Sequence, residues 1–400
     1  MKYELNMTEN KKLGILTGGG DCPGLNSVLY GIMLKAFDSD IECIGILKGW
    51  KGFMNNDTIP LNIAEQDDLH TVGGTLLYTS RTNPFSRIAA AETEEEKNKL
   101  EEKIANEMAE QFKELDIDAL IAIGGDDTLG VADTICKYTN ANIIGCPKTI
   151  DNDLLGTDYT FGFWSAVQLA SNSMDNLTTT ARSHQRIFVV EVMGRDAGFL
   201  TIYSGISSGA DIILIPETPF DLRKHVIEVL KRRVNAGHKY HIIACSEGAY
   251  PSDESLKRDF QTISQQTLDD LPKDTFGNPL LTRLNMSKIL VSELRLNEEL
   301  KKEFKENSTN YECRSVVLGH TMRAGTPTSF DRILGLRLGL ATMKLVLNNN
   351  FGMMVSLKGN EIKSLPLEEG AKKKYVRTDS DIVELRNLMV KIRYKSREIQ

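Results

Sequence analysis

The chain alternates short apolar runs with longer amphipathic stretches along most of its length. Residues 13–16, 119–123 and 212–215 are apolar throughout, with no alternation between apolar and polar side chains. Strands of this kind are typical of a parallel sheet that is covered by helices on both faces. Because such runs alternate with helix-length stretches, the sequence predicts an α/β fold with doubly wound sheets.

Bulk composition excludes several classes of protein. A net charge of −7 over 400 residues argues against a general polyanion-binding surface, so we expect no nucleic-acid partner. No apolar run reaches the ~18 residues of a membrane span, and the first residues lack the apolar core of a signal peptide. The six cysteines are scattered singly, which is typical of reduced thiols. We therefore expect a cytoplasmic protein with no membrane partner.

The length of the chain allows two domains of ordinary size. Residues 92–115 are rich in glutamate and carry apolar residues from Leu100 to Phe112 at four-residue spacing, which predicts a surface helix. Residues 252–308 are polar, charged and poor in strand signals. We expect this second region to be a mostly helical insertion.

In doubly wound folds, ligands bind beyond the carboxyl ends of the strands, where turns lead into helices. The first such turn, residues 17–24, reads TGGGDCPG. Glycines such as Gly19 and Gly20 let the backbone approach an anion closely, and Pro23 suits the start of a helix. The turn matches neither the GxGxxG fingerprint nor a Walker A loop. Taken alone, it indicates either an anion site or a purely structural turn.

The second turn combines Gly125 with two carboxylates, Asp126 and Asp127. A carboxylate beside a phosphate is understandable if Mg²⁺ bridges the two groups, and one aspartate suffices for that. The alternative is that the aspartates cap the following helix, which explains one of them at most.

The third turn runs from Lys148 and Thr149 to Asp151 and Asp153. In an extended segment, residues two apart point to one face, so both carboxylates would share a face. One could then accept a proton from a hydroxyl while the other tunes it or holds a metal. An isolated pair of this kind is more often a turn, but here it follows two other glycine or aspartate turns.

Charged residues also lie at the ends of the later apolar runs. Arginines and a histidine can clamp an anion through bidentate hydrogen bonds, and as a set they describe a pocket for a phosphorylated sugar. These residues are Arg186, Arg195, Glu247, Arg314, His320 and Arg323.

These motifs follow one another in the order found in a known family. With them the chain resembles the 6-phosphofructokinases from Leu13 to about Leu340. The matching motifs are PKTIDND, GTDYTFGF, SHQR, VVEVMGR and LGHTMRAGTPTSFDR.

The resemblance implies two Rossmann-like domains with the active site in the cleft between them. The expected donor domain is 1–162 plus 322–375, and the expected fructose 6-phosphate domain is 163–321 plus 376–400, with the insertion at about 252–308. It also implies a homodimer or homotetramer in which a neighbouring subunit lends arginines to each active site.

The resemblance implies a role for each residue of the three turns. Asp151 matches the base that deprotonates the 1-hydroxyl of the sugar, and Asp126 matches the Mg²⁺ ligand. Arg195 matches a charge-neutralising arginine, and Thr149 and Asp153 complete the catalytic strand end. Phosphoryl transfer needs positioning and charge neutralisation more than covalent chemistry, which agrees with these roles.

The remaining roles concern the two substrates. The implied donor site comprises Gly19, Gly20, Arg81, Gly125, Asp127 and Lys148. The implied fructose 6-phosphate site comprises Thr149, Asp151, Met193, Gly194, Arg195, Glu247, His320 and Arg323, with Arg186 and Arg314 acting across a subunit interface.

Two positions depart from the ATP-using pattern of the family. Members that use ATP usually have glycine at the position of Asp127 and often at that of Lys148, which leaves space for the α-phosphate of the nucleotide. A carboxylate there fills that space, and two like charges about 4 Å apart repel by about 4 kcal/mol at an effective dielectric of about 20. Lys148 supplies a point charge to a donor without adenosine. We therefore expect pyrophosphate as the donor.

Regulation at the effector site of the bacterial enzymes is not expected. The positions of its arginines are taken by Tyr30, Leu34 and Thr178, which cannot bind an anion. Three alternatives remain open: an ATP-dependent enzyme that tolerates Asp127, a non-catalytic regulatory subunit of a hetero-oligomer, and use of sedoheptulose 7-phosphate as acceptor. The intact set of Asp126, Asp151 and Arg195 argues against the regulatory subunit.

Overall fold

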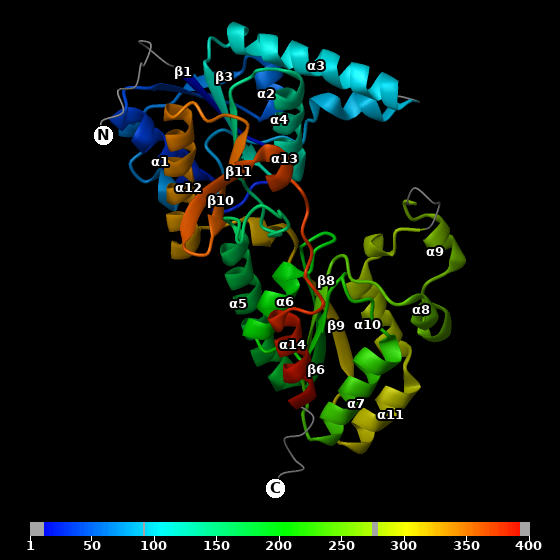
Figure 1. Ribbon diagram of the computed structural model, residues 1–400. Helices are drawn as coiled ribbons and strands as arrows, with labels where there is room; N and C mark the ends of the chain where they lie inside the picture. The colour runs from blue at the N-terminus through cyan, green and yellow to red at the C-terminus, as the bar shows by residue number, and fades with distance from the viewer. Residues whose placement is uncertain (1–11, 91–92, 274–278, 393–400) are drawn as a thin grey trace. The chain divides into compact units, whose positions relative to one another are not determined.

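The computed structural model describes residues 12–90, 93–273 and 279–392 (Figure 1). The chain forms two compact units, which we call unit 1 and unit 2. Unit 1 comprises Met1–Ser165 and Arg323–Lys373, and unit 2 comprises Ala166–Met322 and Lys374–Gln400. None of the helices in these described ranges combines the length and the apolar character that crossing a membrane would require.

Unit 1 is built on a seven-stranded sheet with the order β11-β10-β5-β4-β1-β2-β3. The five inner strands pair in parallel, and only the outer strands β3 and β11 run antiparallel to their neighbours. Every residue of β4 and β5 is buried, as expected for strands covered on both faces. The strands are β1 (Lys12–Thr17), β2 (Glu42–Ile46), β3 (Thr58–Pro60), β4 (Ala119–Gly124), β5 (Ile143–Pro147), β10 (Met353–Lys358) and β11 (Glu361–Pro366).

Helices cover both faces of this sheet. Helices α1 and α12 pack together on one face, and α3 and α4 pack together on the other (Figure 1). The helices are α1 (Leu25–Asp38), α2 (Trp50–Asn55), α3 (Glu94–Glu114), α4 (Asp126–Tyr138), α12 (Ser329–Leu347) and α13 (Leu367–Gly370), with short 3₁₀ helices η1 (Ile63–Glu65), η2 (Leu69–Thr71) and η3 (Pro84–Ala90).

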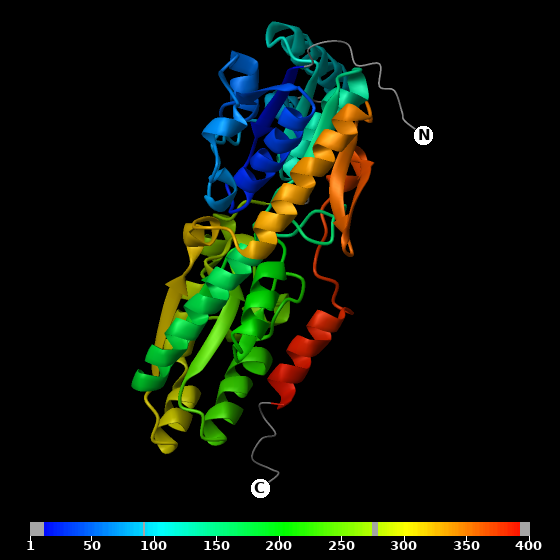
Figure 2. The ribbon, with the colours of Figure 1, turned by 90° about the vertical axis from the view of Figure 1, so that its left-hand side faces the viewer.

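Helices α1 and α12 lie side by side along most of their length (Figure 2). Glycines allow this close approach. A β-carbon added at Gly339 would lie 2.3 Å from the carbonyl oxygen of Val28, and one added at Gly31 would lie 2.5 Å from that of Leu336. Such distances are far below van der Waals contact, so the two helix backbones could not approach this closely with larger residues.

Unit 2 is built on a four-stranded parallel sheet with the order β7-β8-β6-β9. Helices α5 and α6 lie on one face, and α7, α10 and α11 on the other (Figure 1). The strands are β6 (Arg186–Val192), β7 (Ile212–Leu214), β8 (His241–Ser246) and β9 (Glu312–Val317). The helices are α5 (Phe163–His184), α6 (Phe199–Ser207), the π-helix η4 (Arg223–Ile227), α7 (Glu228–Asn235), α8 (Asp253–Asp259), α9 (Gln265–Asp269), α10 (Met286–Leu296), α11 (Glu298–Glu306) and α14 (Asp381–Ile392), with 3₁₀ helices η5 (Leu281–Arg283) and η6 (Gly319–Arg323).

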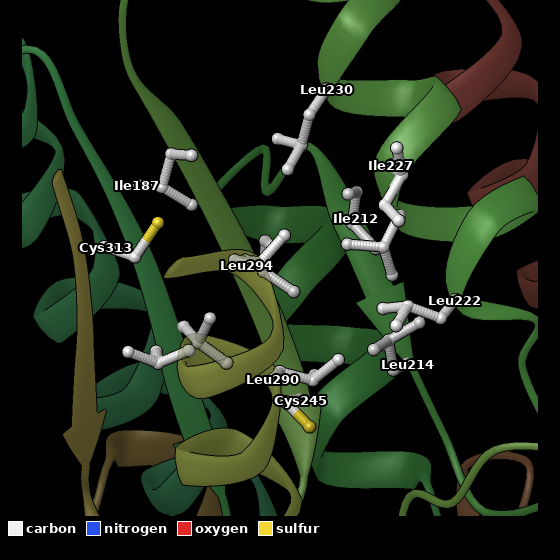
Figure 3. Packing of buried hydrophobic residues seen from close by; sticks show 14 of the residues in the cluster. Ile187, Ile212, Leu214, Leu222, Ile227, Leu230, Cys245, Leu290, Leu294 and Cys313 are labelled. Carbon is white, nitrogen blue, oxygen red and sulfur yellow. The ribbon is translucent and has the colours of Figure 1, made fainter. Parts of the chain in front are cut away.

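The core of unit 2 fills the space between this sheet and the helices α7 and α10. Leu290 and Leu294 of α10 lie in one cluster with Cys313 and Ile187 of the sheet, and Leu230 projects from α7 into the same cluster (Figure 3). All five side chains are buried. Their burial fixes the sheet as a rigid platform for the turns that leave its strands.

The predicted fold class is confirmed: both units are α/β with doubly wound, Rossmann-like sheets. The helix expected over residues 92–115 is α3, and Met108 and Phe112 are buried on its inner face. In the described part of residues 252–308 the regular elements are helices. All six cysteines are free thiols, as the sequence predicts.

The contact between α1 and α12 yields a prediction about stability. Gly339→Ala should lower the free energy of unfolding by about 1–3 kcal/mol, because the added methyl group has no space. Gly130→Ala is the matched control, since a β-carbon there meets no neighbouring atom within 4 Å. That change should raise stability by about 0.4–1 kcal/mol through helix propensity and chain entropy. Urea unfolding followed by circular dichroism measures both, and equal effects would contradict the close approach.

Candidate active site

The carboxyl ends of β1 and β4 mark the point in unit 1 where the strand order reverses. The chain builds outward from β1 through β2 on one side and through β4 and β5 on the other. Thr17 at the end of β1 is in register with Ile123 near the end of β4, and the N–H of Gly18 donates to the carbonyl of Ile123 at 2.9 Å. Such a switch point is where doubly wound sheets bind ligands. The three turns singled out in the sequence leave the sheet at this edge.

Two buried cationic side chains lie against the glycine turn after β1. The ammonium of Lys148 donates to the carbonyl oxygen of Gly20. Arg323 donates from Nη1 to the carbonyl of Asp21 at 3.2 Å, and a β-carbon at Gly20 would lie 2.5 Å from that guanidinium nitrogen. Lys148 is 3% exposed and Arg323 7% exposed. Two cations drawn out of water beside a glycine turn form an environment that favours a bound anion.

The segment that carries Arg81 also lies against this turn. The N–H of Gly19 donates to the carbonyl of Ser80 at 2.9 Å, and the hydroxyl of Thr79 donates back to the carbonyl of Gly19. Arg81 itself is exposed. The structure therefore brings the backbone before Arg81 to the expected donor turn and leaves its guanidinium at the surface.

Asp126 and Asp127 open helix α4 but do not cap it. The N-cap residue is Gly125, and no side chain accepts a capping hydrogen bond there. The capping alternative for the two aspartates is therefore wrong. Asp126 lies 3.3 Å from the ammonium of Lys373, whereas Asp127 is exposed. Both carboxylates stand in the first turn, where the helix dipole favours negative charge.

Asn152 bends the third turn, and this bend changes the expected alignment of Asp151 with Asp153. Its backbone is left-handed, with φ of 52°, so the segment bends instead of continuing extended. The side-chain oxygen of Asn152 accepts from the N–H of Thr160 at 3.1 Å, which holds this bend. The argument that alternation in an extended strand aligns Asp151 with Asp153 is therefore wrong. Asn152 was missed in the sequence, although Asn is one of the few residues that tolerate this conformation.

Asp151 and Thr149 are held together at the start of the bend. The N–H of Asp151 donates to the hydroxyl of Thr149 at 3.0 Å, and the carbonyl of Thr149 accepts from the hydroxyl of Thr160 at 2.7 Å. Asp151 is 3% exposed. A buried carboxylate on a fixed backbone is well suited to accept a proton from a positioned hydroxyl.

Asp153 and Asp126 lie near enough to interact electrostatically. Burial raises the pKa of Asp153, and the neighbouring Asp126 carboxylate raises it further. Two carboxylates that repel each other are a suitable pair for a divalent cation. Within the described ranges no group of three or more His, Cys, Asp or Glu side chains could hold a metal, so phosphate and water oxygens would have to complete such a site. Lys373, next to Asp126, lies in a surface lysine run whose pattern gives no signal of this role.

In unit 2, the turn after β6 holds a strained arginine. A β-carbon at Gly194 would lie 2.5 Å from the carbonyl of Ala197, and Arg195 has a φ of 51°. Left-handed backbone is unfavourable for arginine and persists only where neighbours enforce it. Glu247 enforces it, because its Oε1 accepts from the N–H of Gly194 at 3.1 Å and from that of Arg195 at 2.7 Å.

Three turns of unit 2 leave one edge of its sheet. Met193 follows the end of β6, Glu247 follows the end of β8, and His320 follows β9. The N–H of Met193 donates to the sulfur of Met322 in the same turn region at 3.4 Å, and His320 is exposed. This edge is the carboxyl edge, which is where parallel sheets of this kind bind ligands.

Arg186 and Arg314 do not lie at this carboxyl edge of the sheet. Arg186 begins β6 and Arg314 lies near the beginning of β9, so both are at the amino edge of the sheet. Both donate to the carboxylate of Glu312, Arg186 at 2.6 Å and Arg314 at 2.8 Å, and these bonds lower the pKa of Glu312. The rise of about 3.3 Å per strand residue separates Arg186 from the turn after β6 by roughly 20 Å. The basic residues therefore do not form a single pocket within unit 2.

The hydrogen bonds from the N–H groups of Gly194 and Arg195 to Glu247 can be tested by measuring stability alone. Glu247→Ala should lower the free energy of unfolding by about 1–3 kcal/mol, because two N–H groups lose their acceptor and the left-handed residue loses its support. Glu247→Gln keeps an oxygen in place and should retain most of that stability. Thermal unfolding measures both variants. If they are equally destabilised, the negative charge and not the pair of hydrogen bonds matters.

Comparison with known proteins places this arrangement in a family. The Phosphofructokinase family profile matches residues 12–346. The pyrophosphate–fructose 6-phosphate 1-phosphotransferase of Amycolatopsis methanolica is 40% identical over 359 residues, which cover 90% of this chain and 94% of that protein. The ATP-dependent 6-phosphofructokinase 2 of Clostridium perfringens is 39% identical over 361 residues, which cover 90% and 91%.

A solved structure agrees with these two relatives. The phosphofructokinase of Saccharomyces cerevisiae is similar with a TM-score of 0.68 and 26% identity, over 96% of this chain and 47% of that one. This chain thus spans about half the length of the yeast chain. The family match, the two relatives and the ordered turns at the strand ends agree, and the resemblance seen in the sequence is confirmed: the chain belongs to the phosphofructokinase family.

Proposed function

We propose that the protein is a pyrophosphate-dependent 6-phosphofructokinase, which transfers a phosphoryl group reversibly from pyrophosphate to the 1-hydroxyl of fructose 6-phosphate. The observation that carries the proposal is the buried ammonium of Lys148 on the carbonyl of Gly20, close to the helix that opens with Asp126 and Asp127. The reaction would belong to glycolysis and gluconeogenesis in the cytoplasm.

The donor assignment rests on charge at the glycine turn. A β-carbon at Gly19 would lie 3.2 Å from the ammonium of Lys148, so this cation stands directly against the turn. The N-terminus of α4 would otherwise be a favourable place for a further phosphate. Asp127 puts a fixed negative charge there, which disfavours the α-phosphate of ATP and leaves room for the two phosphates of pyrophosphate.

Mg²⁺ fits the carboxylates of unit 1. Asp126 and Asp153 would hold the ion, consistent with the raised pKa of Asp153 beside Asp126. When bound, the ion would neutralise the phosphate charges and orient the donor. Lys373, 3.3 Å from Asp126, balances the negative charge of this carboxylate in the protein alone.

The chemistry would fall to Asp151 and Arg195. Asp151 accepts the proton of the sugar 1-hydroxyl, and Thr149 and Asn152 fix the bend that carries it. Arg195, held in its left-handed conformation by Glu247, neutralises charge that develops on the transferred group. Arg81 and Gly125 would complete the donor side.

The sugar phosphate would be bound by residues from two chains. Met193, Gly194, Glu247, His320 and Arg323 would contact it in one chain. Arg186 and Arg314, roughly a strand length away from the turn of Arg195, are better placed to serve the site of a neighbouring subunit. A homodimer or homotetramer with shared sites follows from this assignment.

The ATP-dependent reaction is the second candidate, because a relative at 39% identity carries that name. Lys148 alone does not separate the two donors, and the combination with Asp127 favours pyrophosphate. We also propose that the effector site of the bacterial enzymes is not used. Tyr30 at one of its positions instead packs on the ring of His70, with centroids 4.9 Å apart.

Substitution at Asp127 tests the donor assignment. Asp127→Gly should raise kcat/KM for ATP, because it removes both the charge and the bulk. Asp127→Asn is the matched control, since it removes only the charge. Lys148→Met keeps the volume of the buried side chain and should lower kcat/KM for pyrophosphate by about 10–100-fold through loss of a cation beside the developing charge. If the ratio of kcat/KM for pyrophosphate to kcat/KM for ATP is unchanged in Asp127→Gly, the donor assignment is wrong.

Mixed oligomers test the shared site. Asp151→Ser should lower kcat by about 10²–10⁴-fold, and Arg186→Ala should weaken binding of fructose 6-phosphate. If Arg186 serves a neighbouring chain, a mixture of the two variants contains some sites with both residues intact. Random assembly of a dimer would restore about a quarter of the wild-type activity. No recovery after co-expression would show that Arg186 acts within its own chain.

A further inference from the structure

A cavity in unit 2 lies apart from the residues proposed for catalysis. It has a volume of ≈ 300 Å³ and is bounded by the edge strand β7, the π-helix η4 with α7, and the last described helix, α14. Helix α14 packs on α6 beside this edge (Figure 2). None of the residues that line the cavity belongs to the proposed donor or sugar site.

Basic side chains line the cavity. Lys224 and His225 come from η4, Arg232 comes from α7, and Arg386 comes from α14. No aspartate or glutamate lines the cavity among the residues that the structure describes. In a chain of net charge −7, a cavity lined by four basic residues and by no carboxylate has a local potential that attracts anions.

Arg386 is the least exposed of these basic residues. It is half-buried, and burial lowers its pKa, although a guanidinium stays protonated. Its polar partners are neutral: Nη1 donates to the hydroxyl of Thr218 at 3.2 Å, and Nη2 donates to Asn387 at 3.1 Å. Glu217 also acts on Arg386 electrostatically, and its carboxylate accepts hydrogen bonds from the N–H groups of Gly198 and Val376. Among the described residues Arg386 forms no ion pair within 4.0 Å, and a bound anion would stabilise a partly desolvated cation of this kind.

His225 presents a donor to the same space. Its Nδ1 accepts from the N–H of Asp221 at 2.9 Å, so in the neutral ring the proton lies on Nε2. The residue sits in a π-helical turn, Arg223–Ile227, that interrupts the path into α7. Single π turns inside helices occur frequently at functional sites, because they redirect side chains from the regular helical spacing.

The remaining wall of the cavity is apolar. Ile212 and Leu214 of β7, Val229 of α7 and Val390 of α14 line it. A bare inorganic anion would leave this surface in water, whereas an organic group would cover it. The volume is at the lower end of the range for small-molecule pockets.

We propose that this cavity binds a small organic phosphate monoester, with its phosphate on Arg386, Lys224 and His225 and its organic body on the apolar wall. A dianionic phosphate matches this number of donors and charges better than a single carboxylate does. The proposal is independent of which phosphoryl donor the enzyme uses.

The test is isothermal titration of the full-length protein with phenyl phosphate, and with inorganic phosphate for comparison. We expect saturable binding of phenyl phosphate and at least tenfold weaker binding of inorganic phosphate. Arg386→Gln and Lys224→Gln should each weaken phenyl phosphate at least tenfold. Lys391→Gln is the matched control: it lies on α14 about 140° around the helix from Arg386 and should change nothing.

Three results would overturn the proposal. The first is the absence of saturable binding, and the second is equal affinity for inorganic phosphate and phenyl phosphate. The third is unchanged affinity in both Arg386→Gln and Lys224→Gln, which would assign the binding to phosphate subsites elsewhere in the chain. Lys224 is exposed, so its variant keeps the test decisive if Arg386→Gln does not fold.

Discussion

The parallel register of β1, β4 and β5 is the constraint on which the rest of unit 1 depends. Because these strands end at one edge of the sheet, the glycine turn, the start of α4 and the bend at Asn152 lie at the same edge, although they are far apart in the chain. Backbone hydrogen bonds join the three turns: Gly18 donates to Ile123 at 2.9 Å, and Lys148 donates to Gly124 at 2.8 Å. The side chain of Lys148 then reaches back to Gly20. The sheet thus brings together the residues of the proposed donor site.

In unit 2, the corresponding feature is Arg195, which is held in an unfavourable backbone conformation. The left-handed backbone of Arg195 costs on the order of 1–3 kcal/mol, and two hydrogen bonds from backbone N–H groups to Glu247 offset it. Glu247 follows β8, whose neighbour β6 leads into Arg195. The strain is therefore supported by the same parallel pairing that builds the sheet. An arginine fixed in this way loses little freedom when a phosphate binds.

Much of this could be predicted from the sequence, because apolar runs and glycine turns are local signals. The strands, the turns after them and the residues of each turn follow from such signals. The bend at Asn152 could not be predicted, since it depends on Thr160 contacting it from a later loop. The separation of Arg186 from Arg195 is visible in the sequence, because one precedes and the other follows the apolar run of β6. The contact of Lys373 with Asp126 joins residues that are distant in the chain. This contact and the bend at Asn152 are tertiary facts, for which residue type alone carries no information.

We propose that charge at the N-terminus of α4 selects the phosphoryl donor. In this proposal Asp127 disfavours the α-phosphate of ATP, and Lys148 favours the two phosphates of pyrophosphate. The most direct measurement is ³¹P NMR of wild-type protein given fructose 6-phosphate, Mg²⁺ and equal concentrations of pyrophosphate and ATP. The account predicts that the pyrophosphate signal is lost, that orthophosphate and fructose 1,6-bisphosphate appear together, and that the three ATP signals persist. Consumption of ATP with formation of ADP, while pyrophosphate remains, would contradict it.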